Sequence, residues 1–203
     1  YLIFLKMAFE YSQPPYNRDV GIPQDYNWKS LTDRTGAELE SHYLALLRDL
    51  SMRKGLLGQI FAKAQNKIQD PAKLSRLVAM IDETKWTRLG VDVKGDIYEG
   101  ILEKNAEDTK SGAGQYFTPR ALIQAIVECV RPQADTLIAD PAAGTGGFLL
   151  AAYSYLEKHA DLNTDQKERL KKGTFFGNEI VANTRRLCLM NLFLHGIGEM
   201  DGD

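Results

Sequence analysis

A glycine-rich segment between two apolar stretches constrains the fold of this 203-residue chain most strongly. Residues 140–148 read Asp-Pro-Ala-Ala-Gly-Thr-Gly-Gly-Phe, and they follow the apolar run 136–139. Strand, glycine-rich turn and helix occur in this order where an α/β sheet forms a cofactor site at the carboxyl end of a strand. Glycines let the backbone approach a ligand closely because they carry no Cβ. The first turn of the next helix offers unpaired N–H groups to an anion.

The spacing of the glycines narrows the type of cofactor. A dinucleotide fingerprint would need a glycine at position 149, which is Leu149, and a P-loop would need Gly-Lys-Ser/Thr, which is missing. Asp140 is expected at the end of the strand, where its carboxylate can meet a cationic or hydroxyl-bearing part of a ligand. A glycine turn without a ligand is the alternative, and the Asp-Pro start and the doubled glycine at 146–147 make it less favoured. We therefore predict a cofactor site of another kind.

Residues 1 to about 110 read as a mostly helical domain that gives no catalytic hint. The expected elements are a buried helix at 1–9, a loop at 12–27, helices opening at 35–38 and at Pro71 with Asp70 as N-cap, and a helix within 91–107. The apolar spacing turns one face of the two middle helices inward. The inward residues are Leu39, Tyr43, Leu46, Leu47 and Leu50, then Leu74, Leu77, Val78 and Ile81.

A small-residue link at 109–114 leads to a helix predicted at 121–130, with Thr118 as N-cap and Pro119 at its first position. Its inward residues are expected to be Leu122, Ile126, Val127 and Val130. The preceding Tyr116 and Phe117 have two interpretations. They are either buried aromatics ahead of a capped helix, or an aromatic lid over a flat or cationic ligand.

A second strand is expected at 174–178, ending in Glu179. A carboxylate at the end of the second strand binds ribose hydroxyls in Rossmann-like folds, because it accepts hydrogen bonds from both. The usual spacing is about 20 residues, but Glu179 lies 39 residues after Asp140, so the helix and the charged stretch 161–173 between them must be long. A helix follows at 181–195. Its inward residues are Leu187, Met190 and Leu194, and Arg185 and Arg186 point outward.

The composition of the chain limits the classes of function that remain. Hydrophobic residues make up 44% of the chain and charged residues 26%, as in ordinary globular proteins, and the net charge of −2 means that any nucleic-acid contact must be local or supplied by a partner. Cys129 and Cys188 are predicted to be buried reduced thiols of a cytoplasmic protein. The three histidines form no cluster, so no metal site is predicted. The apolar start is too short to span a membrane, and because the first residue is not Met we expect an incomplete protein.

Three of these segments together resemble the methyltransferase subunit of type I restriction-modification systems: residues 114–120, 140–149 and 177–179. Residues 94–99 and the helical region from Tyr1 also resemble that subunit's N-terminal domain. The resemblance implies a site-specific DNA adenine methyltransferase that uses S-adenosylmethionine (SAM). Its fold would be an incomplete Rossmann-like α/β domain at 111–203, preceded by the helical domain at 1–110.

The resemblance also implies which residues line the SAM site. They are Gln115, Tyr116, Phe117, Thr118, Pro119, Arg120, Thr145, Gly146 and Gly147, with Glu179 on the ribose hydroxyls. The expected chemistry agrees with this. The methionine carboxylate would lie at the glycine turn, which includes Gly144, and at the N-terminus of the next helix, its ammonium near Asp140, and the sulfonium within reach of the aromatic faces.

One motif of the family is missing. The family transfers the methyl group at an Asn-Pro-Pro-Phe/Tyr motif, which holds the flipped adenine, and this sequence contains no such tetrapeptide. Residues 13–16, Gln-Pro-Pro-Tyr, differ by an extra methylene and lie in the helical region, so we interpret them as a structural loop. The chain is therefore expected to hold the first half of a SAM site and to be inactive alone.

The resemblance implies DNA, a specificity subunit and a restriction subunit as partners, and no membrane. The helical domain would clamp DNA or contact other subunits, by analogy with the family. Two alternatives stay open: a SAM-dependent methyltransferase acting on RNA or on a protein glutamine, and a non-catalytic helical interaction module. The Gln-Tyr-Phe-Thr-Pro segment at 115–119 favours the DNA enzyme.

Overall fold

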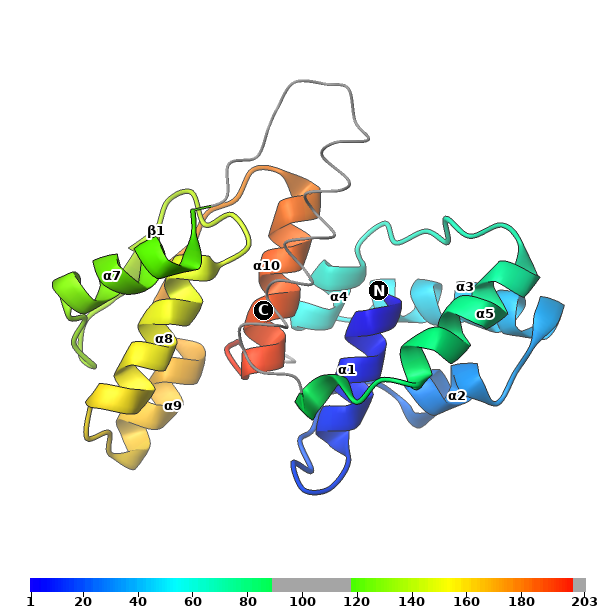
Figure 1. Cartoon of the computed structure of the whole chain (residues 1–203), viewed down its shortest axis with the longest axis horizontal. Helices are drawn as coiled ribbons and strands as arrows, with labels where there is room; N and C mark the ends of the chain where they lie inside the picture. Colours follow the sequence, from blue (N-terminus) through cyan, green and yellow to red (C-terminus); the bar gives the residue numbers. More distant parts are fainter. Residues whose placement is uncertain (89–117, 199–203) are drawn as a thin grey trace. The chain divides into compact units, whose positions relative to one another are not determined.

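The computed structural model describes residues 1–88 and 118–198, which belong to two compact units (Figure 1). One unit comprises residues 1–94 and 200–203, and the other residues 95–199. We call them the helical unit and the α/β unit. The predicted boundary near residue 110, the predicted helix within 91–107 and the residues Gln115, Tyr116 and Phe117 lie outside the described residues.

The described part of the helical unit contains helices and no strand, as the sequence predicts. Its elements are α1 (Leu2–Ser12), the 3-10 turn η1 (Gln24–Tyr26), α2 (Trp28–Thr32), α3 (Gly36–Ser51), α4 (Gly55–Phe61), α5 (Pro71–Asp82) and η2 (Trp86–Arg88). The predicted helices at 1–9, from 35–38 and from Pro71 are confirmed. The sequence reading missed α2 and α4, which have five and seven residues and therefore little periodicity.

The core of the helical unit forms from the predicted faces of α3 and α5. All five inward residues predicted on α3 are buried, and so are Leu74, Val78 and Ile81 on α5, whereas Leu77 is half-buried. Asp70 caps α5 as predicted, because its Oδ1 accepts from the backbone N–H of Ala72 at 2.9 Å. The largest buried side chains, Phe4, Trp28 and Phe61, come from three further helices. The helical unit thus brings five helices into one core.

A charged cluster ties the first helix of this unit to its last elements. Lys6 Nζ lies 2.6 Å from Asp82 Oδ1, and Trp28 Nε1 donates to the same oxygen at 2.7 Å. Glu10 Oε2 accepts from the backbone N–H and the hydroxyl of Thr87, each at 2.8 Å. The hydrogen bond from Lys6, and then that from Trp28, hold the pKa of Asp82 below its usual range against the opposing effect of burial. Because Lys6 and Glu10 are buried, this cluster satisfies charges that would otherwise be costly inside the core.

The α/β unit has two parallel strands among four described helices. Its elements are α7 (Arg120–Val130), β1 (Ile138–Asp140), α8 (Gly147–His159), α9 (Thr164–Lys172), β2 (Phe175–Gly177) and α10 (Ala182–His195). Ile138 pairs with Phe175 and Asp140 with Gly177. A parallel pair needs a long crossover, and α8 and α9 together provide it. Both predicted strands are present, although each has only three residues.

Among the described residues, helices pack against one face of this small sheet. Ile138 and Phe175 pack against buried Leu149 and Leu156 of α8 and Cys188 of α10. On the opposite face, Ala139 and Phe176 are exposed. Met190 and Leu194 of α10 are buried as predicted, Leu187 is half-buried, and Arg185 is exposed while Arg186 is half-buried. The hydrophobic contacts therefore lie between the sheet and the helices α8 and α10.

The structure corrects the prediction for α7. The helix begins at Arg120, its N-cap position is Pro119, and Thr118 does not cap it. Ile123 and Val127 are its buried residues, so the inward assignment is right for Val127 alone and wrong for Leu122, Ile126 and Val130, which are exposed. The reason is that α7 carries two apolar stripes, and its partner α8 contacts the one that contains Ile123. Periodicity cannot distinguish the two.

Two further predictions concern the burial of the two cysteines and the possibility of a membrane-spanning helix. Cys188 is buried as predicted, whereas Cys129 is exposed on α7, contrary to the prediction. Cys129 lies next to Val130, on the side of α7 turned away from α8. In residues 1–88 and 118–198, no helix has the length and apolar character needed to cross a membrane.

Candidate cofactor site

The carboxyl ends of the two strands are level, which brings the predicted acidic residues to one edge of the sheet. Asp140 pairs with Gly177, and the backbone N–H of Asn178 donates to the Asp140 carbonyl at 3.0 Å. The Asn178 carbonyl in turn accepts from Ala143 N–H at 2.9 Å. The glycine turn after β1 is thus hydrogen-bonded to the residues that follow β2. Glu179 comes directly after this linkage.

The turn has a defined backbone conformation. Asp140 Oδ1 accepts from the N–H of Ala142 at 3.0 Å, so the side chain orders the first step of the turn. Gly144 and Gly146 have φ angles of 55° and 86°, in the left-handed region that favours glycine. Gly146 N–H donates to Ala143 O at 2.7 Å, and α8 begins at the next residue. The sequence prediction of strand, glycine turn and helix is confirmed.

Glycine suits each of its positions in the turn for a different physical reason. A Cβ on Gly146 would lie 3.0 Å from Cys188 Sγ, and one on Gly147 would lie 3.0 Å from Ile123 Cδ1, so both allow close packing inside the unit. Among the described residues, the nearest atom to a Cβ on Gly144 would be Ala142 O, at 4.0 Å. Gly144 is therefore the glycine with open space beside it, where a ligand could approach the backbone.

The second carboxylate has a local role as well. Glu179 Oε1 accepts from the N–H of Val181 at 2.7 Å, which fixes the bend between β2 and α10. Glu179 and Asp140 are both half-buried. The spacing of 39 residues, unusually long for a Rossmann-like ribose carboxylate, has a structural cause, because the crossover contains two helices of 13 and 9 residues.

Both carboxylates affect the thiol of Cys188. Burial raises the pKa of this thiol to about 12, and the negative charges of Asp140 and Glu179 add to the effect. Both charges therefore act on one point of α10, beneath the glycine turn. Within the described ranges, no group of three or more His, Cys, Asp or Glu side chains could hold a metal ion. The site offers carboxylates and backbone N–H groups instead.

Three more predicted site residues lie at the start of α7. Thr118 and Pro119 are exposed and Arg120 is half-buried. Ile123 lies one turn further along α7, and its Cδ1 is 3.0 Å from the place that a Cβ on Gly147 would occupy. The start of α7 is therefore near the start of α8. The predicted lid residues before Thr118 are not among the described residues.

Sequence reasoning missed one residue that touches the turn. Asn191 of α10 donates from Nδ2 to the carbonyl of Thr145 at 3.0 Å, and both residues are buried. A signal for it exists in the sequence. An asparagine in mid-helix between Met190 and Leu192 is unfavourable unless its side chain has a partner.

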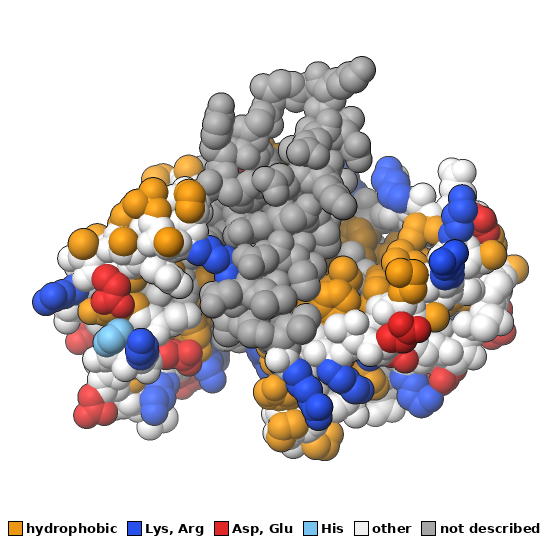
Figure 2. Space-filling model, viewed as in Figure 1, with side chains coloured by type: hydrophobic (Ala, Val, Ile, Leu, Met, Phe, Trp, Pro, Cys, Tyr) orange, Lys and Arg blue, Asp and Glu red, His pale blue; other side chains and the backbone are white. Residues whose placement is uncertain are grey.

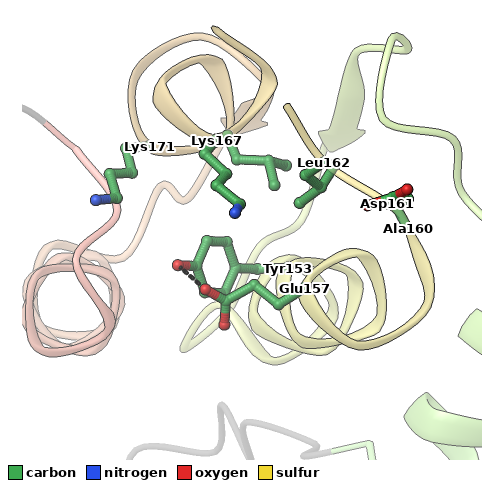
Figure 3. A pocket seen from close by; sticks show the side chains of 8 residues that line it. Tyr153, Glu157, Ala160, Asp161, Leu162, Lys167 and Lys171 are labelled. Atoms are coloured by element: carbon green, nitrogen blue, oxygen red, sulfur yellow. Dashed lines mark hydrogen bonds between the residues drawn. The ribbon is translucent and has the colours of Figure 1, made fainter. Parts of the chain in front are cut away.

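A cavity of about 280 Å³ in the α/β unit lies apart from these residues (Figure 3). It is formed by α8, α9 and the loop between them, and its lining contains none of the predicted site residues. Tyr153 donates to Glu157 Oε1 at 2.7 Å at its floor, and the side chain of Lys167 points into it. The glycine turn at the start of α8 is thus separate from this cavity near the end of α8.

Comparisons with known proteins agree with the geometry. The family model N-6 DNA Methylase matches residues 90–202. The chain is 41% identical, over 98% of its length, to the type I restriction enzyme StySPI methylase subunit of Salmonella potsdam, and 40% identical to the EcoKI methylase subunit of Escherichia coli. It spans 39% of the length of each of these relatives.

A crystal structure assigned to a modification subunit of a type I restriction enzyme from Vibrio vulnificus has a similar fold. The TM-score is 0.81, the sequence identity is 24%, and the match covers 98% of this chain and 48% of the other. At this identity the likeness concerns the fold alone.

Proposed function

The chain belongs to the N-6 DNA methylase family, among the methylase subunits of type I restriction enzymes, and from this premise we propose that it binds SAM at the turn after Asp140. The observation that carries the proposal is the level pair of strand ends. Asp140 and Glu179 flank one edge of the sheet, with a glycine turn and a helix start between them.

The residues present fit the groups of SAM. Its carboxylate suits the N–H groups at the start of α8 and the open backbone at Gly144. Its ammonium suits the carboxylate of Asp140, and its ribose hydroxyls suit Glu179, since an ionised carboxylate accepts from two donors. Gln115 to Pro119 precede α7, Arg120 is its first residue, and these six residues complete the proposed set. When bound, SAM supplies a methyl group that its sulfonium makes electrophilic.

The same arrangement supports a Rossmann-like interpretation of the α/β unit. A parallel pair with a helical crossover, and with a glycine turn at the carboxyl end of its first strand, is the first part of such a fold. We propose that residues 111–203 form that part, preceded by the helical domain at 1–110. Tyr116 and Phe117 would then lie ahead of α7 as an aromatic cover for the sulfonium.

We further propose that this chain supplies the cofactor-binding half of an adenine-specific DNA methyltransferase. The sequence has no Asn-Pro-Pro-aromatic motif to hold a flipped adenine, so the chain alone should transfer no methyl group to DNA. Its net charge of −2 leaves sequence reading and much of the DNA contact to partners, for which a specificity subunit and a restriction subunit are proposed. Methyl incorporation into DNA by the pure chain would contradict this division of labour.

The test of the cofactor site is a titration of SAM into the isotope-labelled chain, followed by NMR of the backbone amides. We expect the amides of Gly144, Gly146 and Gly147 to shift, and Asp140→Ala to abolish the shifts. The matched control is Asp161→Ala, because Asp161 is an exposed carboxylate beyond the opposite end of α8. A helix of 13 residues separates the two sites by about 20 Å.

Three outcomes would contradict the assignment. They are the absence of shifts in the folded wild-type chain, shifts confined to the cavity between α8 and α9, and shifts that persist unchanged in Asp140→Ala. Glu179→Gln refines the result, since it keeps an acceptor but removes the charge. We expect it to weaken the binding of SAM less than Asp140→Ala does.

A further inference from the structure

One peptide unit of the glycine turn is hydrogen-bonded at both of its polar ends. The carbonyl of Thr145 accepts from Asn191 Nδ2 at 3.0 Å, and the N–H of Gly146 donates to Ala143 O at 2.7 Å. The first bond joins residues 46 positions apart and is buried. Asn191 and Thr145 are 5% and 6% exposed, so water competes little for the carbonyl. The peptide unit between Thr145 and Gly146 is thus held by α10.

This peptide unit has an alternative orientation that the glycine makes accessible. Glycine populates positive and negative φ about equally, so a rotation of the 145–146 peptide plane meets little resistance from Gly146 itself, whose φ is 86°. Such a rotation would turn the Thr145 carbonyl away from α10 and reverse the direction of the Gly146 N–H. The bond from Asn191 opposes it, because it requires the carbonyl to face α10.

The orientation of the Thr145–Gly146 peptide determines how the backbone N–H groups at the start of α8 are offered to a ligand. Gly146 is the N-cap of α8, and its carbonyl accepts from Leu150 N–H at 2.9 Å. The unpaired N–H groups of the first turn follow directly, and these are the groups available to an anion. If the turn sampled both orientations, a ligand would have to order it on binding, and the affinity would fall.

We infer that Asn191 is a positioning residue for the cofactor turn: its side-chain amide fixes the Thr145–Gly146 peptide and so pre-organises the site for SAM. The inference rests on the proposed function for its ligand. Cys188 lies one helical turn before Asn191, and its Sγ is 3.0 Å from the place of a Cβ on Gly146. Together the two side chains make α10 the support beneath the turn.

The chemistry requires a donor at position 191. Leucine has a similar size and no donor. Aspartate keeps the shape, but its ionised carboxylate places an oxygen against the Thr145 carbonyl, whereas its protonated form has an O–H that can donate. The two substitutions should therefore differ in pH dependence. Asn191→Asp should bind SAM more tightly relative to wild type as the pH falls, and Asn191→Leu should not.

The experiment measures SAM affinity of the folded full chain at several pH values, with each variant compared with wild type at the same pH. We expect Asn191→Leu to bind about tenfold more weakly at every pH, which corresponds to the loss of one hydrogen bond. Asn191→Asp should be at least as weak above neutral pH and should recover towards wild type in mild acid. Asn183→Asp is the control, because Asn183 is an exposed asparagine on the same helix, and it should bind like wild type.

Hydrogen exchange without SAM gives a second readout. Exchange at residues 144–148 should be faster in Asn191→Leu than in wild type, while exchange in α3 of the helical unit should not change. Wild-type affinity in folded Asn191→Leu, or equal pH profiles for the Leu and Asp variants, would overturn the inference. If wild type does not respond to SAM, the proposed function fails, and the exchange comparison still decides whether Asn191 holds the turn.

Discussion

In the helical unit, Phe4, Trp28 and Phe61 are at most 1% exposed, whereas in the α/β unit Val130, Leu137 and Phe176 are more than half exposed. In the view of Figure 2, hydrophobic side chains gather over α7 of the α/β unit. On that helix, Leu122, Ile126 and Val130 are exposed and are spaced four residues apart, so they form one exposed stripe. Exposed apolar side chains occur in both units, since Met52 and Met80 of the helical unit are 70% and 56% exposed, but among the described residues the α/β unit has more of them.

The cause of the difference is geometric. An amphipathic helix has one apolar face, and the five helices of the helical unit can turn those faces to one another. A parallel sheet has two faces and is usually covered on both, but in the described part of the α/β unit α8 and α10 cover the face that contains Ile138 and Phe175, and no described helix covers the other. All the candidate cofactor residues that the structure describes lie in the α/β unit. The unit that holds the proposed cofactor site is thus the one with more exposed apolar side chains among its described residues.

The largest effect should come from the core of the helical unit. Leu46 is completely buried, so Leu46→Ala should lower the free energy of unfolding of this unit by about 2–5 kcal/mol. Leu137→Ala in the α/β unit makes the same change at a side chain that is 63% exposed, and it should cost less than about 0.5 kcal/mol. Both tryptophans, Trp28 and Trp86, belong to the helical unit, so tryptophan fluorescence during urea denaturation measures the stability of that unit, and amide exchange in α8 measures the stability of the α/β unit. Equal losses for the two variants would break the comparison.

The sequence predicts the longer helices of the helical unit well because the patterns that indicate them are local. The spacing of Leu39, Tyr43, Leu46 and Leu50, and the Asp70-Pro71 helix start, each depend on residues within one helix. The elements it missed, α2 and α4, are short and are held by contacts between helices. The Lys6–Asp82–Trp28 cluster joins residues up to 76 positions apart, and no local pattern indicates it.

In the α/β unit the sequence predicts the order of elements and not their neighbours. Two strands, a glycine turn and two flanking helices are recovered, because turn residues and apolar runs mark them. The buried face of α7 is wrong, since α7 has two apolar stripes and α8 selects the one with Ile123. Asn191 is missed for the same reason: its role depends on Thr145, which is remote in the sequence and adjacent only after α10 has packed beneath the turn.

The glycines with left-handed φ allow a matched test of the two units. Gly146→Ala meets both an unfavourable φ of 86° and the Cys188 Sγ at 3.0 Å, so we expect a loss of about 2 kcal/mol in the α/β unit. Gly36→Ala in the helical unit meets the unfavourable φ of 57° without a described neighbour within 4 Å, and about 1 kcal/mol is expected. Amide exchange in α8 and in α3 measures the two losses. Cys188→Ala should partly restore Gly146→Ala, and the absence of any rescue would exclude the steric part.

The charged cluster should make the helical unit sensitive to acid. The pKa of Asp82 is lowered in the folded state, chiefly by Lys6, so Asp82 contributes stability above its unfolded pKa of about 3.9. That contribution is lost as the pH falls through the lower folded pKa. Asp82→Asn should cost about 1 kcal/mol near neutral pH and should reduce the acid sensitivity of the helical unit.

Asp33→Asn is the control, because Asp33 forms a solvent-exposed ion pair with Lys29 at 2.8 Å, and this substitution should change stability by less than about 0.5 kcal/mol. Urea denaturation followed by tryptophan fluorescence at each pH gives both values, and identical pH profiles for wild type and Asp82→Asn would remove Asp82 from the explanation.

The smallest effect is expected on the exposed stripe of α7. Val130 is 70% exposed, so Val130→Ser should change the stability of the α/β unit by less than about 0.5 kcal/mol, although the same change at the buried Val127 should cost well over 1 kcal/mol. Cys188 provides the measurement, because its buried thiol reacts with an alkylating reagent only when the unit opens. A Cys129→Ser background removes the exposed thiol, so the alkylation rate then reports opening alone. If Val130→Ser accelerated alkylation as much as Val127→Ser, the stripe would be part of a core, and the contrast between a closed helical unit and an open α/β unit would have to be withdrawn.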